Sequence, residues 1–219
     1  MAVDRRFERQ RDQLIELIRG KGIEDERVLA AIRAVPRHKF VDEALRTRAY
    51  EDEALPIGLG QTISQPFTVA HQTVLLSPKP GERILEIGTG SGYQAAVLCE
   101  LGAVVYSIER LRPLYERTRT LLRDLEYRLT CRLGDGSQGW EEVAPFDGII
   151  VTAGAGSIPE PLKLQLREPE GERPGGRLII PVGGQHGQTM NRLVRTGPDT
   201  WGRERTEGFR FVPLISGVR

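Results

Sequence analysis

The stretch Glu86-Ile87-Gly88-Thr89-Gly90-Ser91-Gly92-Tyr93 decides the predicted fold, because it joins an apolar run to a helical pattern. The run RILEI at residues 83–87 has the length and composition of a buried strand, and QAAVL at residues 94–98 favours a helix. An ordinary turn between them would not need three glycines, which permit positive φ angles and a close approach of a ligand to the backbone. Since ligands of open parallel sheets bind at the carboxyl ends of the strands, we expect a binding site here.

Strands alternate with helices on the C-terminal side of this turn, which indicates parallel β-α-β units. The further strands expected are residues 104–108, 128–133, 146–155, 177–182, 190–195 and 209–215. No helical pattern separates the last two strands, so we expect an antiparallel far edge on a mostly parallel sheet.

The first 80 residues have a different character. Apolar residues at helical spacing predict helices around residues 14–18 and 28–35. Residues 50–66 are rich in Gly, Pro and small polar residues, so we expect an ordered loop there rather than a helix or strand. We therefore divide the chain into residues 1–80, a helical cap and loop packed on the sheet, and residues 81–219, an α/β domain, which together form one structural unit.

The composition excludes several classes of protein. The 31 basic and 30 acidic residues nearly cancel, so no field of one sign is available to hold nucleic acid or an anionic membrane. No apolar run is long enough to span a bilayer, and the charged start MAVDRRFERQRDQL lacks the apolar segment of a signal peptide, so we expect a cytoplasmic protein. Neither Cys99 nor Cys131 lies in a ligand pattern, and His38, His71 and His186 share no spacing, so we expect no metal.

The glycine spacing and the acid before it indicate the kind of ligand. Dinucleotide sites use GxGxxG, whereas the order here is GxGxG, and Tyr93 stands where the third glycine would be. The carboxylate of Glu86 would repel a phosphate, but it suits a ligand that carries an amino group and a sulfonium. S-adenosylmethionine (SAM) carries both.

Two further strand ends supply acids in series. Glu109 ends the second strand, where a carboxylate can accept hydrogen bonds from both hydroxyls of a ribose. Asp135-Gly136 closes the third strand, where Asp135 can accept a hydrogen bond from an adenine amino group. Taken alone, Glu109 could be a solvated charge and Asp135-Gly136 an ordinary turn. Their order after the glycine turn favours sites for methionine, ribose and adenine on successive strand ends.

The loop GQTISQP at residues 60–66 indicates no chemistry by itself, since Ser64 has no histidine or acid beside it. Together with other segments it resembles the protein-L-isoaspartate (D-aspartate) O-methyltransferase family. The segments are VLAAIRAVPRHKFVDEAL (28–45), ALPIGLGQTISQP (54–66), LEIGTGSGYQAAVL (85–98), GDG (134–136), FDGIIVTAGA (146–155), PGGRLIIPVG (174–183) and FVPLISG (211–217). The glycine turn is common to many SAM methyltransferases, whereas GQTISQP and FVPL are much narrower, and the resemblance extends from about Leu14 to Gly217.

The resemblance implies a class I SAM-dependent methyltransferase with a Rossmann-like α/β fold: a mostly parallel seven-stranded sheet, helices on both faces and an N-terminal helical cap. It implies transfer of a methyl group from SAM to the α-carboxylate of L-isoaspartyl, and also D-aspartyl, residues in damaged proteins, which initiates repair and leaves S-adenosylhomocysteine. Ser64 falls on the family's active-site serine. The implied SAM-binding residues are Thr62, Ile63, Glu86, Gly88, Thr89, Gly90, Ser91, Gly92, Glu109, Asp135 and Gly136. We expect a monomer whose partners are isoaspartyl peptides and proteins, without metal, nucleic acid or membrane.

Two segments depart from the family pattern, and three alternative functions remain open. Residues 167–176 are longer than the usual link and residues 183–189 form a glycine-rich turn, so we expect surface loops at the rim of the substrate site. A nicotinamide-dependent oxidoreductase is disfavoured by GxGxG and Glu86. A methyltransferase for side-chain carboxylates of a dedicated peptide would share the same sheet, and so would a non-catalytic protein that kept the SAM site.

Overall fold

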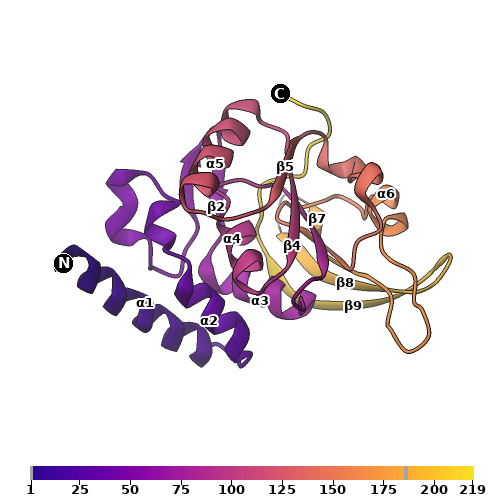
Figure 1. Ribbon diagram of the computed structural model, residues 1–219, viewed down its shortest axis with the longest axis horizontal. Coiled ribbons are helices and arrows are strands. Elements are labelled where there is room, and N and C mark those ends of the chain that lie inside the picture. Colours follow the sequence, from indigo (N-terminus) through magenta and orange to yellow (C-terminus); the bar gives the residue numbers. More distant parts are fainter. Residues whose placement is uncertain (1, 185–186) are drawn as a thin grey trace.

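The computed structural model describes residues 2–184 and 187–219, and strands and helices alternate along the chain from β3 to β7 (Figure 1). The helices are α1 (Ala2–Gly20), α2 (Glu26–Ala34), α3 (Pro66–Leu76), α4 (Tyr93–Glu100), α5 (Arg112–Asp124) and α6 (Glu160–Leu164). Short 3-10 helices are η1 (Arg37–Lys39), η2 (Glu43–Arg48), η3 (Gly136–Gln138) and η4 (Glu141–Val143). The strands are β1 (Leu55–Gly58), β2 (Gln61–Ile63), β3 (Arg83–Ile87), β4 (Val104–Glu109), β5 (Thr130–Leu133), β6 (Gly148–Val151), β7 (Arg177–Gly184), β8 (Gly187–Gly197) and β9 (Thr200–Phe209).

A sheet of seven strands in the order β5-β4-β3-β6-β7-β8-β9 forms the centre of the molecule. Strands β3 to β7 pair in parallel, and β8 and β9 complete one edge in antiparallel. The predicted α/β class, the mostly parallel sheet and its antiparallel edge are confirmed. Because β3 lies between β4 and β6, the residues that follow these three strands meet at one edge of the sheet.

Alternating side chains divide the core between the two faces of the sheet. Ile84 and Ile150 pack with α3 and α4 on one face, whereas Leu85 and Ile149 pack with α6 on the other. Both faces are therefore covered by helices. This explains why the parallel strands are almost continuously apolar instead of alternating between apolar and polar residues.

The N-terminal helices pack beside the sheet as a cap, at the lower left of Figure 1. Ile18 of α1 and Ile32 of α2 are buried in one cluster with Ala96 and Val97 of α4. The helix α3, which belongs to the same part of the sequence, packs directly on β6 and β7. The cap is thus present, and the division of the chain at residue 80 stays a prediction.

The prediction that residues 50–66 form a loop without strands was wrong. β1 and β2 form an antiparallel hairpin that pairs Leu55 with Ile63, and both side chains are buried against the cap. The turn between them, at Gly58, Leu59 and Gly60, has three successive positive φ angles, which gives this stretch the composition of a loop. The strands are stabilised by packing on a distant part of the chain, which local composition does not reveal.

The last strand was also misplaced. β9 is Thr200–Phe209, and residues 210–215, predicted as a strand, instead run past the sheet with one isolated bridge between Pro213 and Gly154. β9 is an edge strand that carries Arg203, Glu204 and Arg205 in sequence, so it lacks the apolar alternation by which strands are detected. The consequence is functional, because the segment after β9 crosses the carboxyl ends of the central strands.

The two segments that depart from the family pattern differ in structure. Residues 168–174 are an exposed turn beside Asp147, whose carboxylate pairs with Arg167 and Arg173. The second segment is mostly strand, since β7 runs to Gly184 and β8 begins at Gly187. Gln185 and His186 lie outside the described residues. The other two histidines, His38 and His71, pack on the rings of Phe7 and Phe209.

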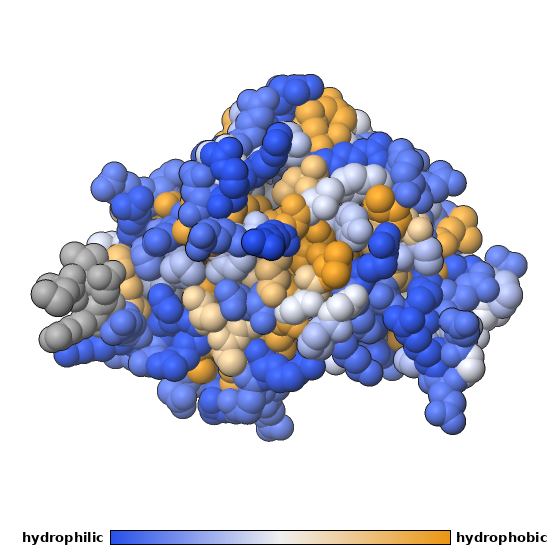
Figure 2. Space-filling view, viewed as in Figure 1, coloured by the Kyte–Doolittle hydropathy of each residue, from blue (hydrophilic) through white to orange (hydrophobic). Residues whose placement is uncertain are grey.

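The visible surface is mostly hydrophilic, with hydrophobic side chains gathered in a strip across its middle (Figure 2). Among residues 2–184 and 187–219, no helix is long and apolar enough to cross a bilayer. The described part of the chain also holds no group of three or more His, Cys, Asp or Glu that could bind a metal ion.

Candidate active site

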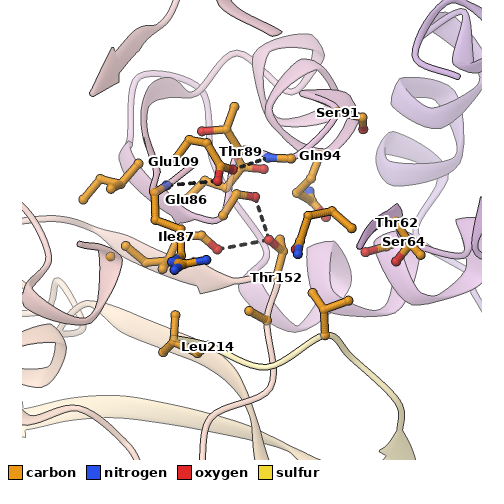
Figure 3. Close-up of a pocket in the computed structure, with 18 of the residues that line it drawn as sticks. Thr62, Ser64, Glu86, Ile87, Thr89, Ser91, Gln94, Glu109, Thr152 and Leu214 are labelled. Carbon is orange, nitrogen blue, oxygen red and sulfur yellow. Dashed lines mark hydrogen bonds between the residues drawn. The ribbon is translucent and has the colours of Figure 1, made fainter. Parts of the chain in front are cut away.

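A cleft of about 760 Å³, part of which is open to solvent, lies at the carboxyl ends of β3, β4 and β6. Three segments form its walls: the glycine turn at residues 86–91, the end of the β1–β2 hairpin at residues 61–64, and the tail at residues 212–215. Figure 3 shows Glu86 and Glu109 on one side and Thr62 and Ser64 on the other, with Leu214 below them. We call the glycine turn with Glu109 and Thr152 the cofactor wall, and the hairpin end at residues 61–64 together with the tail at residues 212–215 the acceptor wall.

The glycine turn is held tightly against the end of β6. Thr152 directly follows β6, and its hydroxyl donates to the carbonyl oxygens of Gly88 at 2.7 Å and of Ile87 at 3.0 Å. Gly88 has a φ of +95°, and a Cβ atom there would lie 2.7 Å from the Thr152 hydroxyl oxygen. Only glycine therefore fits at this position, and the backbone of the turn stays open to the cleft.

Gly92 has a different place. It precedes α4 and does not line the cleft, and an added Cβ would meet Thr118 at 2.8 Å and Leu122 at 3.0 Å, both on α5. This glycine lets α4 and α5 approach each other closely. Its predicted contact with SAM stays a prediction.

Glu109 is almost completely buried, and it fixes the far end of the turn. Its carboxylate accepts hydrogen bonds from the backbone N–H groups of Gly90, Arg110 and Leu111, each at 2.9 Å. Glu109 also lines the cleft. These three donors occupy three of the roughly four lone-pair positions of the carboxylate, so the remaining position, on Oε2, can accept a hydrogen bond from one hydroxyl of a ligand.

Glu86 is fully buried beneath the turn, and only one of its two carboxyl oxygens is satisfied. The hydroxyl of Ser107 donates to Oε2 and lies 2.6 Å from the hydroxyl of Thr89. The other oxygen, Oε1, has no hydrogen-bond partner among the described residues. Burial raises the pKa of Glu86 to about 8, an effect that the nearby charge of Glu109 increases and the bond from Ser107 opposes. Glu86 therefore has one acceptor oxygen that lacks a donor, and its ionised form is disfavoured by burial and by the charge of Glu109.

The acceptor wall brings Ser64 to the boundary between two clefts. Thr62, Ile63 and Ser64 all line the first cleft. Thr62, Ser64, Thr152 and Val212 also line a second, more open cleft of about 1530 Å³. The walls of this second cleft also include Phe67, Thr68, Gln188, Phe209 and Phe211. The two clefts therefore adjoin at Ser64.

The third strand end is only partly in place. Gly136 lines the cleft, whereas Asp135 does not. The carboxylate of Asp135 accepts from Ser137 N at 2.9 Å, from Ser137 Oγ at 2.7 Å and from Gly217 N at 2.7 Å, which ties the C-terminal tail to η3. A contact between Asp135 and adenine stays a prediction, and it would have to coexist with this tether.

Several residues that line the cleft were not identified from the sequence. They are Gln61, Val69, Ile87, Tyr93, Gln94, Ile108, Arg110, Thr152, Ala153, Val212, Pro213, Leu214 and Ile215. Thr152 was assigned to the interior of a strand that in fact ends at Val151. The tail was assigned to the last strand, which in fact ends at Phe209, before the motif FVPL at residues 211–214. Had the predicted strand been limited to its apolar residues, Thr152 would have been placed directly after the strand, at the edge of the sheet where ligands bind.

Comparison with known proteins places this geometry in a family. A family model for protein-L-isoaspartate (D-aspartate) O-methyltransferase matches residues 9–219. The protein-L-isoaspartate O-methyltransferase of Salinibacter ruber is 62% identical over 216 residues, covering 97% of this chain and 94% of the relative. That of Halorhodospira halophila is 51% identical over 212 residues, with 96% and 93% covered.

Solved structures agree with the sequence relatives. A structure named protein-L-isoaspartate O-methyltransferase superposes with a TM-score of 0.83 at 27% identity, covering 95% of this chain and 67% of the other. A structure from Plasmodium falciparum, whose description gives the same enzyme name and bound S-adenosyl-L-homocysteine, has a TM-score of 0.75 at 25% identity, with 93% and 97% covered. This chain therefore belongs to the protein-L-isoaspartate (D-aspartate) O-methyltransferase family.

Proposed function

We propose that the protein transfers a methyl group from SAM to the α-carboxylate of L-isoaspartyl residues in damaged proteins and so initiates their repair. One observation carries this proposal beyond family membership. The first cleft has on its cofactor wall the buried carboxyl group of Glu86, one oxygen of which lacks a hydrogen-bond partner among the described residues. This cleft adjoins a second, more open cleft at Ser64. The first suits a small cationic nucleoside and the second suits a peptide.

The cofactor wall fits SAM. The unpartnered Oε1 of Glu86 can accept a hydrogen bond from an amino group, and a positive ligand would favour the ionised form of this carboxyl. The turn at residues 88–91 brings backbone close to the ligand, and Glu109 offers a fixed acceptor for a ribose hydroxyl. When bound, SAM supplies a sulfonium methyl group that a carboxylate oxygen can take in one displacement, leaving S-adenosylhomocysteine.

The role of the acceptor wall is to position the substrate, and its residues 61–64 and 212–215 include no side chain that could act as a general base. An α-carboxylate has a reference pKa of about 3.5, so at neutral pH it is already an ionised nucleophile. We assign Ser64 the role of donating a hydrogen bond to this carboxylate and directing one oxygen toward the cofactor wall. Positioning of this kind can lower a reaction barrier by roughly 7–11 kcal/mol in favourable cases. The tail at residues 212–215 and the hairpin end limit the access of water to the cleft.

An assay with matched peptides tests the proposal. One peptide contains an L-isoaspartyl residue and its twin contains a normal aspartyl residue at the same place. We expect base-labile methyl ester on the isoaspartyl peptide alone when SAM carries a labelled methyl group. Equal labelling of both peptides would favour a methyltransferase for side-chain carboxylates. Absence of labelling despite SAM binding would favour a non-catalytic protein, and thermal stabilisation by NAD but not by SAM would favour an oxidoreductase.

Finer properties are proposals that the same preparation can test. We propose that D-aspartyl residues are a second acceptor, that the protein acts as a monomer in the cytoplasm, and that it does not bind nucleic acid. A D-aspartyl peptide in the assay tests the first. Size-exclusion chromatography with light scattering gives the mass in solution, to be compared with the 24.4 kDa of one chain.

A further inference from the structure

Arg37, in η1 of the cap, is completely buried directly behind the acceptor wall. Its Nε donates to the carbonyl oxygen of Ala49 at 2.8 Å. Its Nη2 donates to the carbonyl oxygens of Ser64 at 2.9 Å and of Glu53 at 3.3 Å. The guanidinium carbon lies 4.8 Å from the centre of the Tyr93 ring. One side chain thus contacts four separate points of the chain.

These contacts join the two walls of the cleft. Glu53 precedes the β1–β2 hairpin and Ser64 follows it, so the guanidinium holds both ends of the hairpin. Tyr93 begins α4 directly after the glycine turn, and it lines the cofactor cleft. Arg37 therefore contacts both Ser64 of the acceptor wall and Tyr93 at the start of α4, next to the cofactor wall.

The environment of Arg37 indicates a geometric role rather than an ion pair. Burial lowers its pKa to about 10, so the guanidinium is still cationic at neutral pH. The nearby Asp52 already pairs with Lys21 at 2.6 Å, and its carboxylate also accepts from the N–H of Phe67 at 2.8 Å. The described hydrogen bonds of Arg37 all go to backbone carbonyls. A buried charge stabilises a fold poorly, whereas the planar guanidinium suits a fixed set of acceptors that lysine cannot span.

We infer that Arg37 is a positioning residue for methyl transfer: by holding the carbonyl of Ser64, it sets the distance between the Ser64 side chain and the glycine turn. Arg37 does not line either cleft at Ser64, so it acts through Ser64 and not on the substrate. The inference rests on the proposed role of Ser64. A shift of the acceptor wall lowers turnover and leaves the cofactor wall intact, because Gly88, Gly90 and Glu109 are held by the strand ends.

Arg37→Lys tests the inference, because it keeps the charge and removes the planar donors. We expect kcat for the isoaspartyl peptide to fall about 10- to 100-fold while the Kd for SAM changes less than about threefold. Rates are normalised to the number of SAM-binding sites, so partial unfolding does not imitate the effect. Arg195→Lys is the matched control: Arg195 is also buried and donates to the carbonyls of Leu166 and Pro198, both at 2.6 Å, away from both clefts. It should lower the melting temperature without lowering kcat.

A double variant separates this inference from the role of Ser64 itself. If Arg37 acts through Ser64, adding Arg37→Lys to Ser64→Ala lowers the residual rate by less than about twofold. Effects that multiply in the double variant would overturn the inference, and so would a loss of SAM affinity as large as the loss of kcat. Ser64→Ala with unchanged kcat would instead overturn the proposed function of the serine. If Arg37→Lys does not fold, Arg37→Gln takes its place, and failure of both to fold would show that Arg37 serves stability alone.

Discussion

The cofactor wall and the acceptor wall enclose the same cleft, but they are built in different ways. The cofactor wall consists of residues at the carboxyl ends of β3, β4 and β6, and short hydrogen bonds such as that from Gly90 to Glu109 at 2.9 Å hold them together. The acceptor wall consists of a hairpin that packs in the core of the cap and a tail from the end of the chain that bridges to Gly154 after β6. The cofactor wall is thus fixed by the sheet, whereas the hairpin of the acceptor wall is fixed by packing and by side chains such as Arg37.

This difference assigns separate tasks to the two walls. A wall that is part of the sheet is rigid before any ligand arrives, which suits binding of one invariant ligand. A wall made of a hairpin and a tail can differ between proteins without disturbing the sheet, which suits recognition of a variable peptide. Variants on the cofactor wall should therefore change SAM affinity, and variants on the acceptor wall should change turnover.

Ser64→Ala is the sharpest test of that separation and should have the largest effect. We expect kcat for the isoaspartyl peptide to fall about 100-fold or more, because the acceptor carboxylate loses the donor that orients it. The Kd for SAM, measured by calorimetry, should stay within about threefold of the wild-type value. Ser91→Ala is the matched control, since Ser91 lines the same cleft from the cofactor wall. A collapse of SAM affinity in Ser64→Ala would contradict the separation.

Gly92→Ala tests whether this glycine belongs to the packing of α4 on α5 or to the SAM site. Its φ of +88° and the 2.8 Å approach of an added Cβ to Thr118 predict a loss of about 2 kcal/mol in the free energy of unfolding. Denaturant unfolding measures this loss. Gly20→Ala is the control, since Gly20 is exposed and a Cβ there would have no neighbour within 4 Å. Unchanged stability with a weaker Kd for SAM would restore the predicted ligand contact.

What could be predicted from the sequence follows the same division. The glycine turn and Glu109 were identified because strand, turn and acid are neighbours in the chain, and the topology of a parallel sheet brings their ends together. The parallel direction of the central strands followed from the alternation of apolar runs and helical patterns, whereas the order of the strands in the sheet was not predicted. These are local signals combined with one general rule of topology.

The acceptor wall could not be predicted in the same way. Ser64 was noticed only through resemblance to a family, because no local pattern marks a serine that works without a base. Arg37 stands in a run of charged and apolar residues with nothing to indicate complete burial. The hairpin and the tail were assigned wrongly, since their conformations depend on packing against residues far away in the chain. Periodicity in the sequence detects the local preference of a segment for helix or strand. The conformations of the hairpin and the tail are instead set by contacts with other elements.

Glu109→Gln sharpens the comparison on the cofactor wall with an intermediate effect. Glutamine keeps the size of the side chain and one acceptor oxygen, but it loses the charge and one of the two oxygens that hold the turn and would accept from a ribose hydroxyl. We expect the Kd for SAM to rise about tenfold and kcat at saturating SAM to change little. The same measurement on Glu82→Gln is the control, because Glu82 pairs with Arg177 and does not line the cleft. An unchanged Kd would remove Glu109 from the ribose site.

Glu86 gives the smallest effect, one that depends on pH. Its folded pKa of about 8 is raised above the ordinary value, so its neutral form stabilises the fold fully at low pH and this contribution is lost as pH rises toward 8. Between the ordinary pKa of 4.5 and the folded pKa of about 8, the free energy of unfolding should therefore fall by at most about 1.4 kcal/mol for each pH unit. This dependence on pH should be absent in Glu86→Gln.

The same carboxyl should also change the number of protons released when SAM binds. A positive ligand stabilises the ionised carboxyl, so SAM binding at pH 7 should release up to one proton in the wild-type protein and fewer in the variant. Calorimetry in two buffers of different ionisation enthalpy counts these protons. Equal release by both proteins would mean that the unpartnered oxygen of Glu86 does not face the charge of the ligand, and the cofactor wall would then bind SAM through its backbone and Glu109 alone.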